Sequence, residues 1–336
     1  MTAQHNALPA QAIQAAQETF PANPKLYGVD VAKAELVLAN GGQITTIANQ
    51  SRAVKAWLSQ LKAPALIAME STSTYHQLLA DLAFAAGHRV FVLNPKQLKH
   101  YRTATQGRAK TDLCDAQLIA RYLAKEHADL HPYRPLTKEG GRLSSLLRRR
   151  AAVVKAMTQL RLSLQPQAEA LELEVELKNA LEALSQIIQS IDVQIEKLLA
   201  HAQHQPRAAR LLSIVGVGPL NAAALLVALE RGDFPDADAF VAFLGLDPTP
   251  RDSGQCRGRR RLSKHGDSES RRLLFNAARS ASLTSVWKPI YERYRKRGLG
   301  DVQTLCIIAR KIARTAWSIC KHGTTFCPKR LTQALT

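Results

Sequence analysis

The sequence predicts an α/β domain, followed by a long helical hairpin and a second domain that is mainly α-helical. Residues 25–130 alternate strand and helix signals, and residues 140–202 repeat apolar residues at helical spacing. Residues 207–322 are again helical, apart from one glycine-rich basic loop. A chain of 336 residues is long enough for two or three such domains. Residues 1–24 and 323–336 lack these patterns, so we expect a disordered tail at each end.

The α/β prediction rests on the order of the patterns in residues 25–130. Three β-rich stretches come first, and Gly41 and Gly42 form the turn before the third. A helix, a short buried strand, a second helix and a last strand closed by Pro95 follow. Antiparallel strands followed by strand–helix alternation predict a mixed sheet. In order, the stretches are KLYGVDVAKAELVLAN, QITTIAN, residues 51–61, ALIAMES, residues 74–86 and HRVFVLN.

The hairpin prediction rests on a heptad repeat. Apolar residues recur at alternating spacings of four and three in its second half, which is typical of a coiled-coil seam. The first half shows the same spacing but misses one position at Arg150, and Pro166 separates the two helices. We expect a coiled coil that pairs within the chain or between chains. Its seam residues are Leu143, Leu146, Val153, Met157, Leu160, Leu164, Leu177, Leu181, Leu184, Ile188, Ile191, Ile195 and Leu198.

In the second domain, the stretch LLSIVGVGPLNAAALLVAL has the form of a helix-hairpin-helix. Gly216 and Gly218 in its turn leave room for backbone N–H groups to approach a phosphate. An ordinary helical corner is the alternative interpretation.

Positive charge is concentrated in two segments. The net charge is +19, and residues 250–336 carry 20 Lys and Arg against 5 Asp and Glu. Residues 142–165 add six basic residues and no acids, including Arg148, Arg149 and Arg150. Segregated charge of this kind indicates a polyanionic partner, most simply nucleic acid. A solvated basic face that keeps the protein soluble is the alternative.

Cysteine usage and hydropathy indicate the compartment. The five cysteines lack CxxC pairing, so a disulfide framework or a zinc site is not expected. The longest uncharged run, residues 211–229, is broken by a Gly-Val-Gly-Pro turn, which argues against a membrane span. We therefore expect a cytoplasmic protein, associated with the nucleoid when it acts, without a membrane partner.

Four acidic residues are candidate metal ligands. Asp30 and Glu70 each end an apolar strand, and Asp112 and Asp115 lie three residues apart, so that they share one helix face. Oxygen ligands suit Mg²⁺, and such ions stabilise the attacking and leaving oxygens of a phosphodiester. Taken singly, Asp30 and Glu70 are more often a helix cap or a solvated strand end, and Asp112 could equally be an acid in the first turn of a helix.

The loop of residues 245–267 contains Ser253 and a run of cations. A serine among guanidinium groups could attack a phosphate, because the cations stabilise the charge of the transition state. Alternatively, the loop only positions a phosphate and its serine bonds the backbone. From the residues alone, the positioning role is preferred. Both interpretations place this loop on DNA or RNA.

Taken in order from about residue 25 to 320, these motifs resemble the insertion-sequence-110 family of DEDD transposases. This family includes the Piv-type invertases and the bridge-RNA-guided recombinases. The motifs GVDVAK, AMESTSTYH and AKTDLCDAQLIA are similar to its RuvC-like domain, which has an RNase H fold. The motifs GVGPLNAAALL, FLGLDPTPRDSG, GRRRLSKHGD and RRLLFNAARSA are similar to its transposase domain.

The resemblance implies a role for each candidate. Asp30, Glu70, Asp112 and Asp115, the acidic tetrad, would hold Mg²⁺ or Mn²⁺. Ser253 would be the nucleophile that joins a DNA 5′ phosphate, contributed by the second domain of the same or another subunit, which reverses the preference from the residues alone. Some members carry Gly-Gly after this serine, where this chain has Gly254-Gln255; Ser263 is a weaker candidate.

The resemblance also implies partners and a function. We expect a DNA transposase or recombinase that forms a dimer or tetramer, acts on target and donor DNA, and uses a noncoding bridge RNA. A Holliday-junction resolvase and a non-enzymatic nucleic-acid-binding scaffold are the alternatives. The residues expected to contact nucleic acid are Arg108, Lys110, Arg148, Arg149, Arg150, Gly216, Gly218, Arg257, Arg259, Arg260, Arg261 and Lys264.

Overall fold

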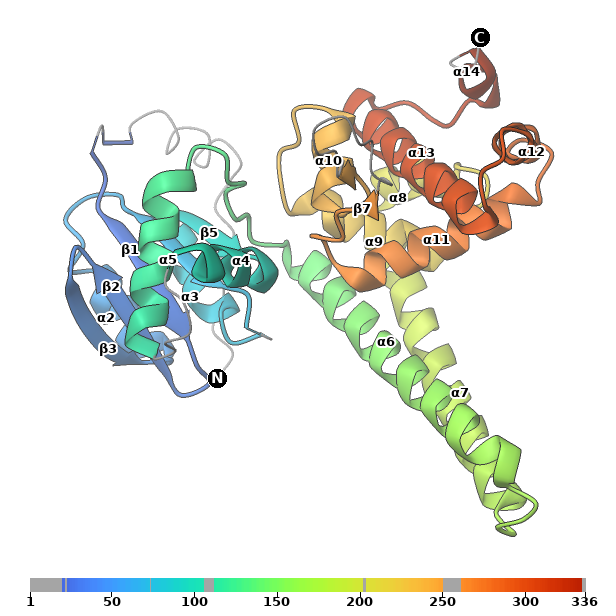
Figure 1. Cartoon of the computed structure of the whole chain (residues 1–336), viewed down its shortest axis with the longest axis horizontal. Helices are drawn as coiled ribbons and strands as arrows, with labels where there is room; N and C mark the ends of the chain where they lie inside the picture. Colours follow the sequence, from blue (N-terminus) through green and yellow to red (C-terminus); the bar gives the residue numbers. More distant parts are fainter. Residues whose placement is uncertain are drawn as a thin grey trace. The chain divides into compact units, whose positions relative to one another are not determined.

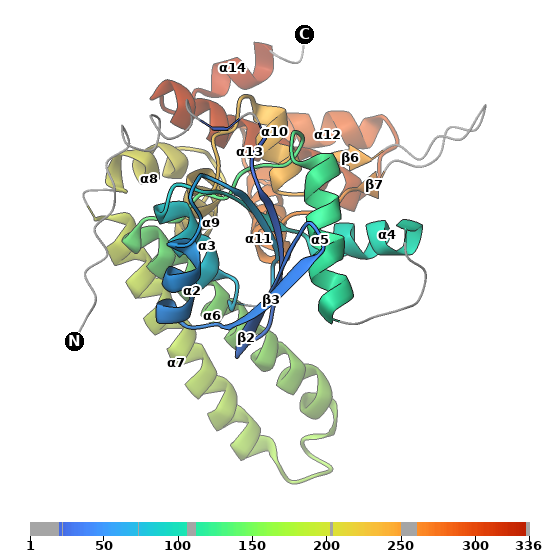
Figure 2. The same cartoon turned by 90° about the vertical axis from the view of Figure 1, so that its left-hand side faces the viewer.

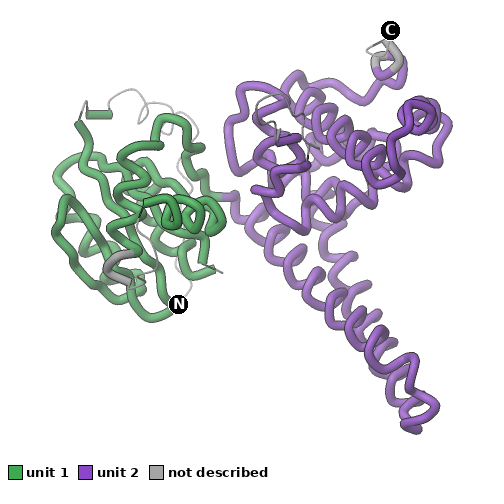
Figure 3. Tube along the Cα trace, in the orientation of Figure 1, with its two compact units in different colours: residues 1–135 green, residues 136–336 purple. Residues whose placement is uncertain are grey.

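The chain forms two compact units, residues 1–135 and residues 136–336 (Figure 3). The computed structural model describes residues 20, 21, 23–72, 74–105, 112–201, 204–249 and 261–333. Most of the expected N-terminal tail lies outside this part. We describe each unit by itself.

Unit 1 is built on a five-stranded mixed sheet of order β3-β2-β1-β4-β5 (Figure 1). The central strand β1 is antiparallel to β2 and parallel to β4, while β3 and β5 extend the sheet at its two edges. All five strands were expected from the sequence. Their bounds are Leu26–Val31 for β1, Glu35–Asn40 for β2, Gln43–Ala48 for β3, Leu66–Glu70 for β4 and Arg89–Leu93 for β5.

Helices cover both faces of this sheet. Helices α2 (Ser51–Leu58) and α3 (Gln77–Ala85) bury Trp57 and Leu79 against one face. Helices α4 (Pro95–Thr105) and α5 (Asp112–Glu126) pack on the other face. This mixed sheet with flanking helices is compatible with the expected RNase H-like domain.

Helix α4 was not expected from the sequence, because Pro95 was interpreted only as the end of a strand. Proline suits the first position of a helix, where its missing N–H has no partner to lose. The Asn94 side chain accepts a hydrogen bond from the Lys96 N–H (2.9 Å), which satisfies one free donor of the first turn. An Asn-Pro pair after a strand is therefore a helix start here.

Unit 2 begins with the helical hairpin of α6 and α7, which run side by side over their length (Figures 1 and 2). A bundle of helices and a two-stranded ribbon follow. The bounds are Lys138–Leu164 for α6, Gln165–Gln167 for the 3-10 turn η1, Glu174–Leu199 for α7, Gln205–Leu212 for α8, Pro219–Glu230 for α9, Ala237–Phe243 for α10, Pro248–Thr249 for β6, Arg261–Leu262 for β7, Ser268–Ser282 for α11, Lys288–Lys296 for α12, Asp301–His322 for α13 and Pro328–Gln333 for α14.

The base of the hairpin belongs to the main core of unit 2. Leu143 and Leu147 from α6 and Ile191 and Ile195 from α7 are buried in the same cluster as the bundle helices. The hairpin therefore has no separate core at this end, although the sequence suggested a distinct domain. The missing seam position, Arg150, points to α7 and forms a two-bonded ion pair with Asp192 (Nε–Oδ1 2.5 Å, Nη2–Oδ2 3.1 Å).

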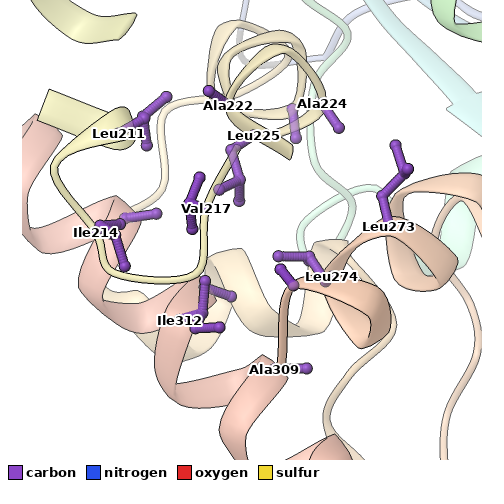
Figure 4. Close-up of a cluster of buried hydrophobic side chains, with 14 of the residues drawn as sticks. Leu211, Ile214, Val217, Ala222, Ala224, Leu225, Leu273, Leu274, Ala309 and Ile312 are labelled. Atoms are coloured by element: carbon purple, nitrogen blue, oxygen red, sulfur yellow. The ribbon is translucent and has the colours of Figure 1, made fainter. Parts of the chain in front are cut away.

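The bundle core lies where α8, α9, α11 and α13 meet (Figure 4). Leu211, Val217, Leu225, Leu274 and Ile312 contribute from separate segments and are almost fully buried. The helical run of residues 207–322 was thus predicted correctly. Across the described parts of both units, no helix combines the length and the apolar character that a membrane span requires.

The segment after His322 was expected to lack regular structure, and it differs from that expectation. Gly323 ends α13 in a left-handed conformation (φ 68°), and α14 follows. The Phe326 ring stacks on Trp287 at 6.3 Å, and its N–H donates to Ser213 Oγ (3.0 Å). Two aromatic rings distant in sequence thus dock this segment on the bundle.

Candidate active site

Two of the four predicted acids lie at one edge of the sheet in unit 1. Strands β1 and β4 are parallel neighbours, and Val29 pairs with Met69 in their register. Asp30 and Glu70 are the next residues on the two strands. Their side chains are therefore close neighbours at the carboxyl ends of the strands, which is where functional groups of α/β sheets gather.

Side-chain alternation places both acids on the α5 face of the sheet. Val29 and Met69 point to the opposite face, where they pack with α2 and α3. Gly28 faces α5, because a Cβ at residue 28 would lie 2.3 Å from the Ala116 carbonyl oxygen. Asp30 is two residues beyond Gly28 and has the same orientation.

Helix α5 approaches the sheet so closely only because residue 28 has no side chain. Ala116 packs with Val37 and Ala39, whereas Leu26 at the start of β1 packs in the cluster of Ile119 and Leu123. Helix α5 thus runs opposite to β1, and its first turn lies at the end of β1 that carries Asp30. That first turn begins at Asp112, whose side chain is outside the described part.

Asp115 already has a partner. The Arg102 Nη2 group on α4 donates to Asp115 Oδ1 at 2.6 Å, and the Asp115 side chain is 13% exposed. The Arg102 Nε atom is buried without a hydrogen-bond partner. Sequence reasoning missed Arg102, because nothing in the spacing of the acids signals a partner on the preceding helix.

The donor chemistry at this edge suits a hard cation, since carboxylates are the ligands that Mg²⁺ prefers. Within the described residues, no three His, Cys, Asp or Glu side chains are grouped closely enough to hold a metal. The Arg102–Asp115 ion pair occupies one of the predicted ligands. Arg108 and Lys110, predicted to contact phosphate, lie outside the described residues, so their role stays a prediction.

The predicted serine loop grows from the ribbon of β6 and β7 in unit 2. Thr249 pairs with Arg261, which is the last residue pair of this ribbon that the structure describes. Below it, the Ser263 N–H donates to the Asp247 carbonyl (2.9 Å), and Ser263 Oγ donates to the Asp247 carboxylate. Ser263 thus closes the base of the loop. Four predicted residues lie outside the described part, namely Ser253, Arg257, Arg259 and Arg260.

Arg271 on α11 also supports the base of the serine loop. Its Nη1 group donates to the carbonyl oxygens of Gly266 (2.5 Å) and Leu244 (3.3 Å). Gly266 must be a glycine here, because a Cβ would lie 2.2 Å from the Phe243 carbonyl oxygen. Burial lowers the pKa of Arg271, and Asp267 raises it in part. No motif or spacing in the sequence indicated that Arg271 supports the loop.

We expect Ser263→Ala to lower the strand-exchange activity that the family resemblance implies by roughly tenfold or less, because it removes a supporting hydrogen bond to a carboxylate. Ser263→Thr keeps the hydroxyl and should restore most of the activity. Exchange rates of both variants, with melting curves as the control, test this. A loss well beyond 100-fold in Ser263→Ala with an unchanged melting curve would instead indicate that Ser263 takes part in the chemistry.

The predicted helix-hairpin-helix is a tight corner between α8 and α9. Gly216 adopts a φ of 92°, and a Cβ there would lie 2.5 Å from the Ala281 Cβ atom. Its missing side chain therefore serves packing on α11. Gly218 precedes α9 and has open space around its Cα, so a phosphate contact by its N–H stays a prediction.

The predicted basic residues of α6 differ in their surroundings. Arg150 is held by Asp192 inside the hairpin. Arg148 and Arg149 are exposed. Desolvation, then the positive charges of Arg231 and Arg149, lower the pKa of Arg148, which Asp267 raises in part. The positive charges of Arg148, Arg149 and Arg231 therefore lie near one another, and contact of Arg148 and Arg149 with nucleic acid stays a prediction.

Two sequence matches cover well over half of the chain. Residues 27–170 match a family described as Transposase, named for the DEDD domain of IS110 elements, and residues 208–295 match the Transposase IS116/IS110/IS902 family. The chain belongs to the IS110 family of transposases. The first match spans the sheet edge with Asp30 and Glu70, and the second spans the serine loop.

Similar proteins bear this out. The IS110-family chain is 28% identical over 265 residues to the "Pilin gene-inverting protein" of Moraxella bovis, covering 77% of this chain and 80% of the relative. It is 28% identical to the "Probable family 20 transposase" of Pseudomonas aeruginosa, covering 79% and 86%. It is 27% identical to the "Transposase for insertion sequence element IS1328" of Yersinia enterocolitica, covering 78% and 86%.

Proposed function

We propose that this IS110-family transposase recombines the DNA of its own mobile element by forming a covalent phosphoserine link to DNA. The observation that carries the proposal is the edge where Asp30 and Glu70 end adjacent parallel strands on the face that α5 covers. A relative named for inverting a pilin gene supports DNA rearrangement as the outcome.

The acidic tetrad would hold Mg²⁺ or Mn²⁺, which, when bound, polarises the scissile phosphate. Four carboxylates are the kind of donor that such an ion prefers, and Asp115 would have to be shared with Arg102 or released from it. Arg102 holds the Asp115 carboxylate in place through a charge-assisted hydrogen bond of 2.6 Å. Gly28 keeps the first turn of α5 close to Asp30.

Ser253 would perform the chemistry from the loop above the β6–β7 ribbon. Its oxygen forms a bond to phosphorus while the bond from phosphorus to the 3′ oxygen breaks. The serine loses a proton and the 3′ oxygen gains one, which leaves a 5′-phosphoserine and a free 3′ hydroxyl. The reverse reaction with another 3′ hydroxyl rejoins the strands. Arg261 and its neighbours would stabilise the developing charge.

Further parts of the proposal concern partners. Target and donor DNA would be the substrates, a noncoding bridge RNA would guide the choice of site, and two or four copies would assemble. The hairpin supports assembly, since Leu162, Val175, Ile187 and Val193 remain exposed on its two helices. Isolated exposed apolar residues are common, but four on one helical hairpin suit a coiled-coil contact.

The test is to co-express the protein with the DNA that flanks its gene, add Mg²⁺, and map any DNA-linked peptide by mass spectrometry. We expect an adduct at Ser253, absent in Ser253→Ala, together with a copurifying RNA whose sequence can be read. DNA cleavage without an adduct would indicate a resolvase-like endonuclease. DNA binding with neither cleavage nor adduct would indicate a scaffold.

A further inference from the structure

We propose that one face of α13 in unit 2 is a binding surface for the backbone of duplex DNA. This cationic α13 face consists of Arg310, Lys311 and Arg314, with Arg293 of α12 beside it and Lys264 at one end. The inference rests on the proposed function, namely that the chain acts on DNA. Its three α13 cations lie beyond both matched ranges, residues 27–170 and 208–295, whereas Arg293 and Lys264 lie within the second.

Helix α13 separates its apolar and charged sides cleanly. Ile308, Ile312 and Ala316 are buried in the bundle core. Arg310 and Arg314 are one turn apart on the other side, and Lys311 lies next to them, half-buried or exposed. Residues four apart are about 6 Å apart along a helix, so neighbouring side chains can reach different phosphates.

Positive charges on this face crowd one another. Lys311 lies within the electrostatic reach of Arg314, Arg293 and Arg310, and after burial these three lower its pKa. Like charges one turn apart destabilise a helix. Because these four cations repel one another, an anion that binds between them should stabilise the fold.

Within the described residues, few carboxylates neutralise the cationic α13 face. Of the three α13 cations, Arg314 is the one that has an ion pair with a described carboxylate, that of Asp238 on α10. Lys311 has no ion pair to any residue that the structure describes, and the Arg310 Nε atom is buried without a hydrogen-bond partner. A polyanion would supply what this face lacks.

The face continues toward the serine loop. The charge of Lys264 acts on the thiol of Cys306, whose pKa burial raises and Lys264 lowers in part. Cys306 lies one turn before Arg310 on α13. Lys264 follows β7 and is held by a bond from its N–H to the Gly245 carbonyl (3.1 Å). A DNA backbone on the face would thus run toward the base of the loop that carries Ser253.

The composition of the face favours a duplex over a single strand. Single-strand sites alternate cations with aromatic rings on which bases stack. Trp317 is the aromatic residue nearest to these cations along α13, but its indole N–H donates to the Phe234 carbonyl (3.2 Å) and Lys321 Nζ lies over its ring (5.6 Å). This ring is therefore already held by other groups, and the cations themselves do not alternate with aromatic rings. Backbone contacts by Arg and Lys alone are typical of binding that does not read the bases.

The experiment measures duplex affinity by fluorescence anisotropy between about 50 and 200 mM salt. We compare the wild-type protein with a variant carrying Arg310→Gln, Lys311→Gln and Arg314→Gln. The matched control removes three scattered lysines, Lys55, Lys62 and Lys178, also to Gln. We expect the magnitude of the slope of log K against log salt to decrease by about 2 to 3 in the first variant. In the control variant, this magnitude should decrease clearly less.

Asp238→Asn gives a second test that does not depend on the folding of the triple variant. Removing this carboxylate frees Arg314, so duplex binding should tighten and become more salt-dependent. If the wild-type protein binds duplex and neither variant changes the slope, this inference fails and the proposed function stands. If the wild-type protein binds no DNA, both fail. If only binding of a structured RNA falls, the assignment to DNA is wrong.

Discussion

Gly28→Ala is expected to destabilise unit 1 by about 3 kcal/mol, and Gly28→Val to prevent its folding. A Cβ at residue 28 would lie 2.2 Å from the Ala120 backbone nitrogen and 2.3 Å from the Ala116 carbonyl oxygen. Both obstacles are backbone atoms of α5, so no rotamer change or side-chain truncation relieves the clash. Helix α5 must move away from β1, and its first turn must move away from Asp30.

Two measurements check this prediction. The melting midpoint of unit 1 should fall by about 10 °C in Gly28→Ala. Hydrogen exchange should rise in the peptides that contain β1 and α5, while those of the bundle in unit 2 stay unchanged. Gly141→Ala is the control, because a Cβ there meets nothing within 4 Å and alanine favours a helix. Equal stability of Gly28→Ala and wild type would contradict the close approach of α5.

The sheet of unit 1 could be predicted from the sequence because its signals are local. Alternating or continuous apolar residues mark each strand, and Gly41-Gly42 marks the turn between β2 and β3. The same patterns placed Asp30 and Glu70 at strand ends. That these two acids lie side by side follows only from the parallel pairing of β1 and β4, which joins segments forty residues apart.

Contacts between elements could not be predicted in this way. Asp115 looked like an isolated acid at a helix start, yet Arg102 on α4 holds it. Arg150 looked like a break in the seam and a possible phosphate ligand, yet Asp192 holds it. Each partner lies on another helix, and a single sequence contains no periodicity that connects an ion pair across two helices.

The ends of helices were also hard to read. Helix α4 begins at Pro95, which also ends the strand pattern of β5. Helix α14 lies beyond Gly323, in a segment without apolar periodicity. Short helices carry few turns over which a period can be seen, so tertiary contacts decide them. For α14, the stacking of Phe326 on Trp287 supplies such a contact.

Asp30→Asn is expected to lower strand exchange by roughly 100-fold or more while leaving the fold and DNA binding intact. Asparagine has the size of aspartate but lacks the charge that a hard cation requires. If Asp30 only ended a strand, the amide would be tolerated, since such positions accept either residue. Single-turnover exchange rates, duplex affinity and melting curves measured on one preparation separate these outcomes.

Three matched variants make this prediction decisive. Asp81→Asn removes a carboxylate of α3 that accepts a hydrogen bond from Tyr133 (2.7 Å), and it should leave strand exchange nearly unchanged.

Asp115→Asn and Arg102→Gln both break the same ion pair. If Asp115 serves only that pair, the two should lose equal activity. If Asp115 is a ligand, Asp115→Asn should lose far more than Arg102→Gln, and additional Mn²⁺ should recover part of the loss in Arg102→Gln alone. Full activity in Asp30→Asn and Asp115→Asn would exclude the acidic tetrad as the reacting centre.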